Sequence, residues 1–145
     1  MFKFDTEADE WSSLAPMPVA VSDHSASVLD GLVYIVGAGR DNIHTHRFDP
    51  VLGAWSTLAP TLNSHWLGFS FVAGGCLYVA GGGRGCRSSA ERYDEATDTW
   101  AAVADMLEGR VYCSAVTIGS SGPAEEQDLF DSLIAKSLKG RPAAV

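Results

Sequence analysis

Residues 68–105 read GFSFVAGGCLYVAGGGRGCRSSAERYDEATDTWAAVAD, and this stretch decides the fold. Short runs of apolar or alternating residues are separated by glycines, by aspartates or by pairs of the two. Runs of four to eight residues bounded by such turn formers are typical of β-strands rather than helices. The stretch therefore predicts four strands joined by tight turns.

The same pattern returns along the chain at an interval of 44 or 45 residues. The landmarks that return are Trp11, Trp55 and Trp100, then Phe4-Asp5, Phe48-Asp49 and Tyr93-Asp94, and finally Tyr34–Gly37 and Tyr78–Gly81. A repeat of mid-forties length with four antiparallel strands is the size of one blade of a β-propeller. We therefore expect an all-β chain made of propeller blades.

The landmarks also place the expected blades. Two complete four-stranded blades are expected at 24–60 and 68–105, and a half blade with strands three and four only at 1–16. A further apolar run, RVYCSAVTIG at 110–119, reads as another strand one. Asp30-Gly31 lies between two apolar runs and predicts a hairpin turn, because both residues tolerate positive φ.

Gly81-Gly82 after an apolar strand, followed by Tyr93 and Trp100, resembles the kelch repeat. Two glycines let the backbone turn sharply where neighbouring blades crowd together, and the aromatic rings pack between sheets. The first full copy departs from the pattern, because Ala38 stands where the second glycine is expected. The resemblance covers about residues 1–119 and implies a partial kelch β-propeller.

In such propellers the last strand of the chain completes the first blade, so 110–119 resembles a closing strand. The chain then looks like the C-terminal part of a kelch-like protein, the family with BTB, BACK and kelch domains. About three blades are fewer than the ~4–8 of a closed propeller. We expect a fragment or short isoform of a longer protein, with self-association as the alternative.

The tail at 121–145 has a different period and predicts a C-terminal helix. Pro123 suits the first helical turn, lysines follow later, and Gly140 and Pro142 end it. Its apolar stripe consists of Leu129, Phe130, Leu133, Ile134 and Leu138. Packing against the propeller is the preferred interpretation of this stripe, and docking of a partner is the alternative.

The composition of the chain excludes some classes of binding partner and favours one cellular compartment. The formal net charge is −8 and the pI about 4.7, which argues against nucleic acid or an anionic membrane as the partner. No apolar run reaches the ~20 residues of a membrane span. Three cysteines at 76, 86 and 113 without a CxxC pair indicate reduced thiols. We expect a cytoplasmic protein.

By the same resemblance, the partner surface is built from loops that join strand two to three and strand four to the next strand one. Arginines and an aromatic residue gather in those loops, and arginine captures carboxylates in a bidentate way. The expected binding residues are Arg40, Asp41, Asn42, Asn63, Ser64, His65, Trp66, Arg84, Arg87 and Arg110. A protein or acidic peptide is the expected ligand, although Trp66 alternatively fills a gap between blades.

Catalytic and cofactor motifs are missing from the sequence: it contains no GxSxG, no phosphate-binding GxxxxGK and no HExxH. His44 and His46 alternate on an expected strand, but two ligands are too few for zinc. We expect a non-enzymatic binding module without a cofactor, resembling the substrate-recognition domain of a cullin ubiquitin ligase adaptor. The alternatives are an actin-associated kelch protein and a kelch-type copper oxidase, which would gather tyrosines and histidines at one mouth.

Overall fold

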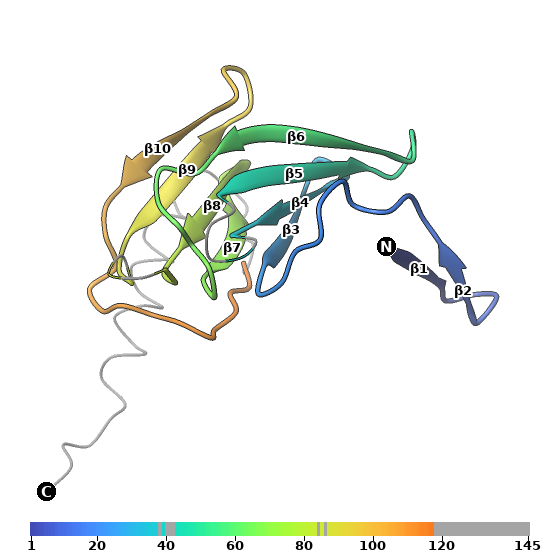
Figure 1. Ribbon diagram of the computed structural model, residues 1–145, viewed down its shortest axis with the longest axis horizontal. Coiled ribbons are helices and arrows are strands. Elements are labelled where there is room, and N and C mark those ends of the chain that lie inside the picture. Colours follow the sequence, from blue (N-terminus) through green and yellow to red (C-terminus); the bar gives the residue numbers. More distant parts are fainter. Residues whose placement is uncertain (38, 40–42, 84, 86, 118–145) are drawn as a thin grey trace, which may run out of the picture. The chain divides into compact units, whose positions relative to one another are not determined.

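The computed structural model describes residues 1–37, 39, 43–83, 85 and 87–117 (Figure 1). The secondary structure of these residues is ten β-strands with no helix. They are β1 (Phe2–Asp5), β2 (Glu10–Ser13), β3 (Ser25–Leu29), β4 (Leu32–Val36), β5 (His44–Asp49), β6 (Ala54–Pro60), β7 (Phe69–Ala73), β8 (Cys76–Ala80), β9 (Ala90–Asp94) and β10 (Thr99–Val103). The prediction of an all-β chain is confirmed.

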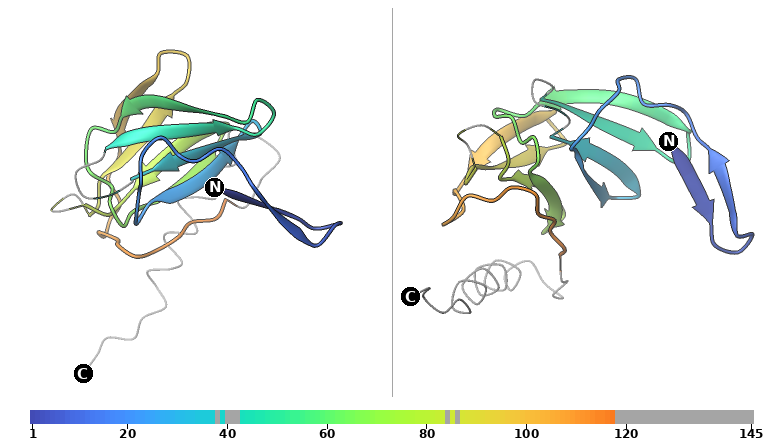
Figure 2. Two further views of the ribbon diagram at one scale, coloured as in Figure 1. Left: turned by 45° about the vertical axis from the view of Figure 1, so that its right-hand side comes forward. Right: turned by 60° about the horizontal axis from the view of Figure 1, so that its bottom comes forward.

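The strands form two four-stranded sheets of the same topology and one two-stranded sheet. The first has the order β3-β4-β5-β6, the second β7-β8-β9-β10, and β1 pairs with β2 (Figure 2). Every pairing is antiparallel and joins strands that are consecutive in the sequence. The prediction of four-stranded antiparallel blades is therefore confirmed.

Each repeat turns from its third to its fourth strand in the same way. The carboxylate of Asp49 accepts the backbone N–H groups of Val51 and Leu52 at 2.8 and 2.9 Å. Asp5 and Asp94 make the equivalent pair of bonds. An aspartate that bonds the backbone two or three residues ahead stabilises a tight turn, which explains the aspartate of each aromatic-Asp landmark.

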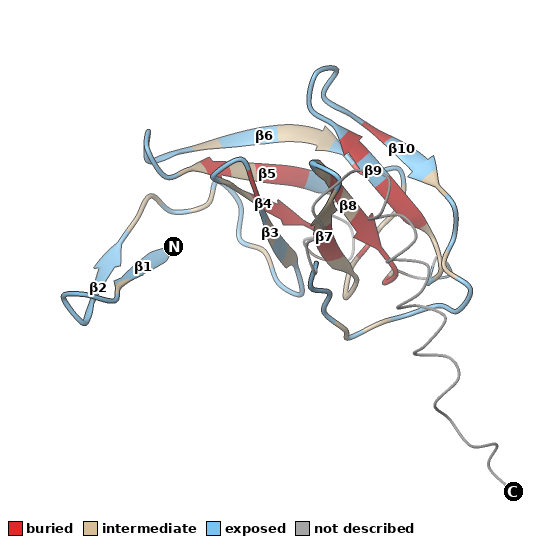
Figure 3. Ribbon diagram, turned by 180° about the vertical axis from the view of Figure 1, so that it is seen from behind, coloured by how far each residue is buried: buried red, intermediate tan, exposed pale blue. Residues whose placement is uncertain are grey.

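The main hydrophobic core lies between the two four-stranded sheets. The sheets lie with β3 against β7 and β6 against β10. Figure 3 shows the buried residues along the middle strands of both sheets. The core consists of Leu29, Tyr34, Val36, Leu77, Val79, Tyr93 and Trp100. Alternate residues of β4 and β8 point into it, as the two-residue period of a strand requires.

Polar groups bridge the same interface between the sheets. The Trp100 indole N–H donates to Thr45 Oγ1 at 3.0 Å, and the Tyr34 hydroxyl donates to Glu95 at 3.2 Å. Arg47 also bonds Glu95, at 2.9 Å. Each of these bonds joins one blade to the other, so the polar tips of the landmark rings are satisfied across the interface.

The three repeats hold their landmark ring pairs in the same geometry but bury them differently. Ring centroids lie 5.1 Å apart in Phe4–Trp11 and 5.2 Å apart in Tyr93–Trp100. Trp11 is 70% exposed, whereas Trp100 is 5% exposed. Trp100 lies in the core that the first blade covers, so this ring is buried by a preceding blade rather than by its own sheet.

The structure differs from the expected closing strand at 110–119, because its described part, 110–117, contains no strand. The main-chain groups here bond loops instead: the Tyr112 N–H donates to the Leu67 carbonyl at 3.0 Å, and the Arg110 carbonyl accepts the Gly82 N–H at 2.8 Å. Alternation alone favours a strand, but a strand also needs a free neighbouring edge. The helix expected at 121–145 lies outside the described residues. In the described part of the chain, we find no helix with the length and hydropathy to cross a membrane.

Candidate functional site

Three connections of the second blade meet at one edge of its sheet. They are the loop between β6 and β7, the loop between β8 and β9, and the segment after β10. Their main chains are bonded directly: the Gly83 N–H donates to the Trp66 carbonyl at 2.7 Å, and the Arg110 N–H donates to the Arg87 carbonyl at 2.8 Å. We call the described residues 61–67, 81–83, 87–89 and 106–112 the loop edge.

Glycines at the end of β8 allow this close approach. Gly81, Gly82 and Gly83 have φ values of 69°, 72° and 67°, in the left-handed region that favours glycine. A Cβ on Gly82 would lie 2.5 Å from the Trp66 carbonyl oxygen. The glycine pair of the repeat is therefore required because another loop crosses directly over it.

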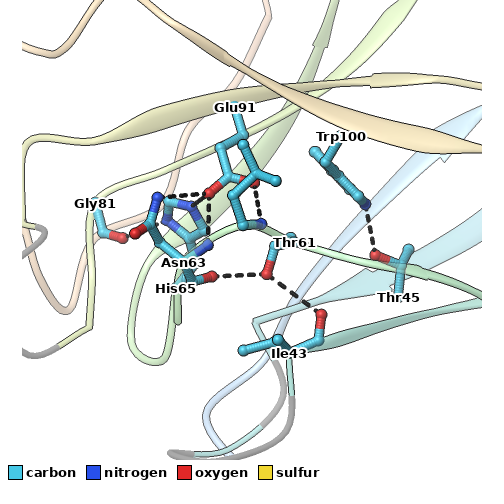
Figure 4. A network of polar contacts seen from close by, with 9 residues as sticks. Ile43, Thr45, Thr61, Asn63, His65, Gly81, Glu91 and Trp100 are labelled. Atoms are coloured by element: carbon cyan, nitrogen blue, oxygen red, sulfur yellow. Dashed lines mark hydrogen bonds and ion pairs between the residues drawn. The ribbon is translucent and has the colours of Figure 1, made fainter.

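A buried polar network fixes the loop between β6 and β7 (Figure 4). Glu91 of β9 accepts the backbone N–H groups of Leu62 and Asn63 at 2.7 and 2.8 Å, and the Asn63 side chain at 3.0 Å. Its fourth partner is His65 Nε2 at 3.0 Å. The side chains of His65 and Glu91 are both fully buried. Glu91 thus tethers this loop to the sheet at four points.

The network makes the stability of the protein depend on pH in the acid range. Burial by itself raises the pKa of Glu91, but the hydrogen bonds from His65, Leu62 and Asn63 outweigh it and hold that pKa below its ordinary value. A carboxyl group whose pKa is lower in the folded than in the unfolded protein stabilises the fold at pH values above its unfolded pKa of about 4.3. This stabilisation is lost as the pH falls through the pKa of the folded protein.

We therefore expect the free energy of unfolding to fall on acidification below about pH 5, with each pKa unit worth about 1.4 kcal/mol. Denaturant titrations across this range measure the slope. The Glu91→Gln variant, which has no carboxyl to titrate here, is expected to be less stable at neutral pH and to show a shallower slope. Equal slopes for the two proteins would contradict this assignment.

The structure separates the expected binding residues into two groups. The side chains of Asn63 and His65 turn inward and bond Glu91, so they hold the loop in place. Arg87 and Arg110 are exposed and lie on two adjoining loops, and Arg110 pairs with Glu108 at 3.1 Å. Ser64 and Trp66 are half-buried at the same edge. Arg40, Asp41, Asn42 and Arg84 lie outside the described residues.

Trp66 is held at the edge by its polar tip. Its indole N–H donates to Asp23 Oδ2 at 3.1 Å, while the ring remains partly exposed. The Leu67 N–H donates to the Asp23 carbonyl at 3.2 Å, so the same residue anchors the backbone beside the ring. Trp66 is thus neither wholly buried between blades nor free on the surface.

Sequence reasoning missed Tyr112, which is 80% exposed at the loop edge. Asp23, Leu67 and Tyr112 occupy one repeat position, 44 and 45 residues apart, and share positive φ values of 56°, 63° and 55°. Each of the last two donates its N–H to the carbonyl of the one before. The repeat interval was the signal that could have found this position.

The residues that an oxidase site would need are engaged elsewhere. Tyr34 and Tyr93 are buried between the sheets, where Glu95 and Asp98 accept their hydroxyls. His46 is buried and His44 exposed, and the pairing of β5 with β6 shifts register beside His44, which interrupts the expected alternation. In the described residues, no three His, Cys, Asp or Glu side chains lie close enough together to hold a metal.

Comparison with known proteins shows which family the repeat matches. The kelch motif family model matches residues 70–107. Kelch-like protein 36 of Bos taurus is 32% identical over 70% of this chain, and kelch-like protein 35 of Mus musculus is 30% identical over 72% of it. An F-box/kelch-repeat protein of Arabidopsis thaliana is 40% identical over 54% of the chain. The matched region spans 18% of the length of each of these relatives.

A solved structure supports the same fold. The structure of YjhT, a kelch-type propeller, superimposes with a TM-score of 0.65 over 76% of this chain and 46% of the other, at 18% identity. The likeness agrees with the sheet order and the glycine, tyrosine and tryptophan landmarks of the two full blades. The chain is therefore built of kelch repeats that form part of a β-propeller, and it is related to the kelch-like proteins.

Proposed function

We propose that the loop edge binds another protein by capturing an acidic segment of it. The observation that carries the proposal is the main-chain bond that joins the loops of Arg87 and Arg110 at the loop edge, to which the half-buried Trp66 also belongs. Arginine and tryptophan dominate the binding energy of many interfaces, and a guanidinium matches a carboxylate in two bonds. Arg40 and Arg84, which the sequence assigns to loops of the same class, belong to the same proposal.

The distribution of charge along the sequence supports an acidic rather than a basic ligand. The chain has ten lysines and arginines against eighteen acidic residues, and four of those ten are Arg40, Arg84, Arg87 and Arg110. Positive charge is thus concentrated in these connections on an otherwise acidic chain. Opposite potentials across an interface speed association and exclude partners of the wrong sign.

By analogy with the kelch-like relatives, the cellular role proposed is substrate recognition for a cullin ubiquitin ligase. Recruitment of the cullin would belong to BTB and BACK domains in a longer protein, and this chain would supply the contact with the substrate. The proposed setting is the reducing cytoplasm, which agrees with free thiols at Cys76 and Cys113.

Selection from a displayed library of random peptides tests the binding proposal. We expect enrichment of peptides with closely spaced Asp and Glu, and a loss of about 1–4 kcal/mol in binding free energy for a selected peptide when Trp66 or Arg87 is replaced with alanine. The matched control is Arg92→Ala, which removes an exposed arginine from β9 instead.

The control variant should bind as the unchanged protein does, and replacing the acidic residues of the peptide with Asn and Gln should abolish capture. Selection of peptides without acidic residues would overturn the choice of ligand. Equal losses for Arg87→Ala and Arg92→Ala would remove the loop edge as the binding surface.

A further inference from the structure

His65 lies between two hydrogen-bond acceptors. Its Nδ1 is 2.7 Å from the Gly81 carbonyl oxygen, and its Nε2 is 3.0 Å from Glu91 Oε1 (Figure 4). A carbonyl oxygen only accepts, so Nδ1 carries a proton. A neutral imidazole has one N–H and one lone pair, and would therefore turn its lone pair toward the Glu91 carboxyl group.

Glu91 is surrounded by donors and so keeps its negative charge. The Leu62 N–H reaches Oε2, while the Asn63 N–H and its side-chain amide reach Oε1. A carboxylate that accepts several N–H groups is strongly favoured over the protonated acid. His65 Nε2 must then donate as well, which requires a proton on both ring nitrogens.

We propose that His65 is a buried imidazolium, and that its charge fastens the loop 61–67 to β9 and so positions Trp66 at the loop edge. The role of Trp66 in binding rests on the proposed function, whereas the charge on His65 does not. His65 is fully buried and is therefore a positioning residue, not a contact for the partner.

The repeats of this chain supply an internal comparison. At the position of His65, the preceding repeat has Val21, and at the position of Glu91 the first blade has His46. The first blade and the segment before it therefore lack both members of the His65–Glu91 pair. In the following repeat the place of His65 is taken by Arg110, a permanent cation. Arg110 is exposed and pairs with Glu108, so it does not share the buried surroundings of His65.

The surroundings of the ring define how it responds to pH. Within the described residues, the titratable group in contact with the ring is Glu91 of β9. The end of β8 contributes the Gly81 carbonyl, and the loop itself contributes the neutral amide of Asn63. Loss of the imidazolium proton as the pH rises leaves a lone pair facing an acceptor, so the loop loosens toward alkaline pH.

Two-bond proton–nitrogen correlation spectra of the imidazole rings test the charge directly. We expect His65 to show both ring nitrogens protonated at about pH 7.5, which is above the ordinary imidazole pKa of about 6.5. A neutral ring for His65 at that pH would overturn the proposal. This measurement needs no partner and no variant.

Hydrogen exchange tests the fastening of the loop. Protection of the Leu62 and Asn63 amides, corrected for the intrinsic pH dependence of exchange, should fall by about tenfold to about a hundredfold once His65 is neutral. The His65→Arg variant, which keeps a charge at this position, should retain protection at the same pH, whereas His65→Gln should lose it at every pH. Protection that is independent of pH in the unchanged protein would contradict the proposal that the charge on His65 fastens the loop.

Binding of a selected acidic peptide provides the functional arm. With His65→Gln, its affinity should fall while Arg92→Ala leaves it unchanged, and with His65→Arg its pH dependence should flatten. If the ring is charged and the loop loosens on deprotonation but peptide affinity does not change, then the charge on His65 does fasten the loop, and its proposed effect on binding is wrong. If no acidic peptide binds at all, the proposed function fails without affecting the spectra.

Discussion

Replacing Trp100 with alanine is expected to cost about 3–5 kcal/mol of stability, the usual loss when a large core aromatic is truncated. The ring is 5% exposed, packs against Tyr93 and belongs to the core between the two blades. Its truncation also leaves Thr45 Oγ1 without its indole donor. Urea titration with two probes, one in each blade, measures the loss and shows whether the blades still unfold together.

Trp11→Ala is the matched control, because Trp11 occupies the same repeat position but is 70% exposed. Its truncation should change stability by less than about 1 kcal/mol, as surface substitutions usually do. Comparable losses for the two variants would mean that the rings are equally buried, and would contradict packing of the second blade on the first.

Gly82→Ala is expected to be the other strongly destabilising change. A φ of 72° costs a non-glycine residue about 1–3 kcal/mol, and the added Cβ would meet the Trp66 carbonyl oxygen at 2.5 Å and Gly68 Cα at 2.8 Å. Forcing atoms into such a site costs about 1–3 kcal/mol more. Denaturant titration should therefore show a combined loss of about 2–6 kcal/mol.

Gly75→Ala separates the two contributions, because Gly75 has a φ of 70° but no atom within 4 Å of the added Cβ. It should lose only the backbone part, about 1–3 kcal/mol. If Gly75→Ala is as damaging as Gly82→Ala, the crossing of the loop over Gly82 is not what requires glycine there.

Much of the fold could be predicted because the landmarks are periodic. Trp55 and Trp100, the aromatic-Asp pairs and the glycines return at an interval of 44 or 45 residues, and each has a physical reason that depends on residues nearby in the sequence. The Asp-Gly hairpin at Asp30-Gly31 likewise depends on neighbouring residues only, and both have positive φ as expected. Repetition adds independent examples of the same pattern.

The direction of loop side chains could not be predicted in the same way. Asn63 and His65 were expected at the binding surface, but they face Glu91, a residue 28 and 26 positions further along the chain. Spacing identifies which loop a residue belongs to and says nothing about which side of the loop it faces. The run at 110–119 shows a similar limit, since its alternation is local whereas strand pairing depends on a distant edge.

The most direct test of the account is a nuclear Overhauser spectrum of the indole N–H of Trp100. Face-to-face packing of kelch blades predicts a cross-peak from this proton to the Thr45 methyl group, 55 positions away in the sequence, and cross-peaks between the rings of Tyr34 and Tyr93. A spectrum that shows the contacts within each sheet, such as Tyr93 with Trp100, but lacks those between Trp100 and Thr45 would contradict the arrangement that brings the loops together.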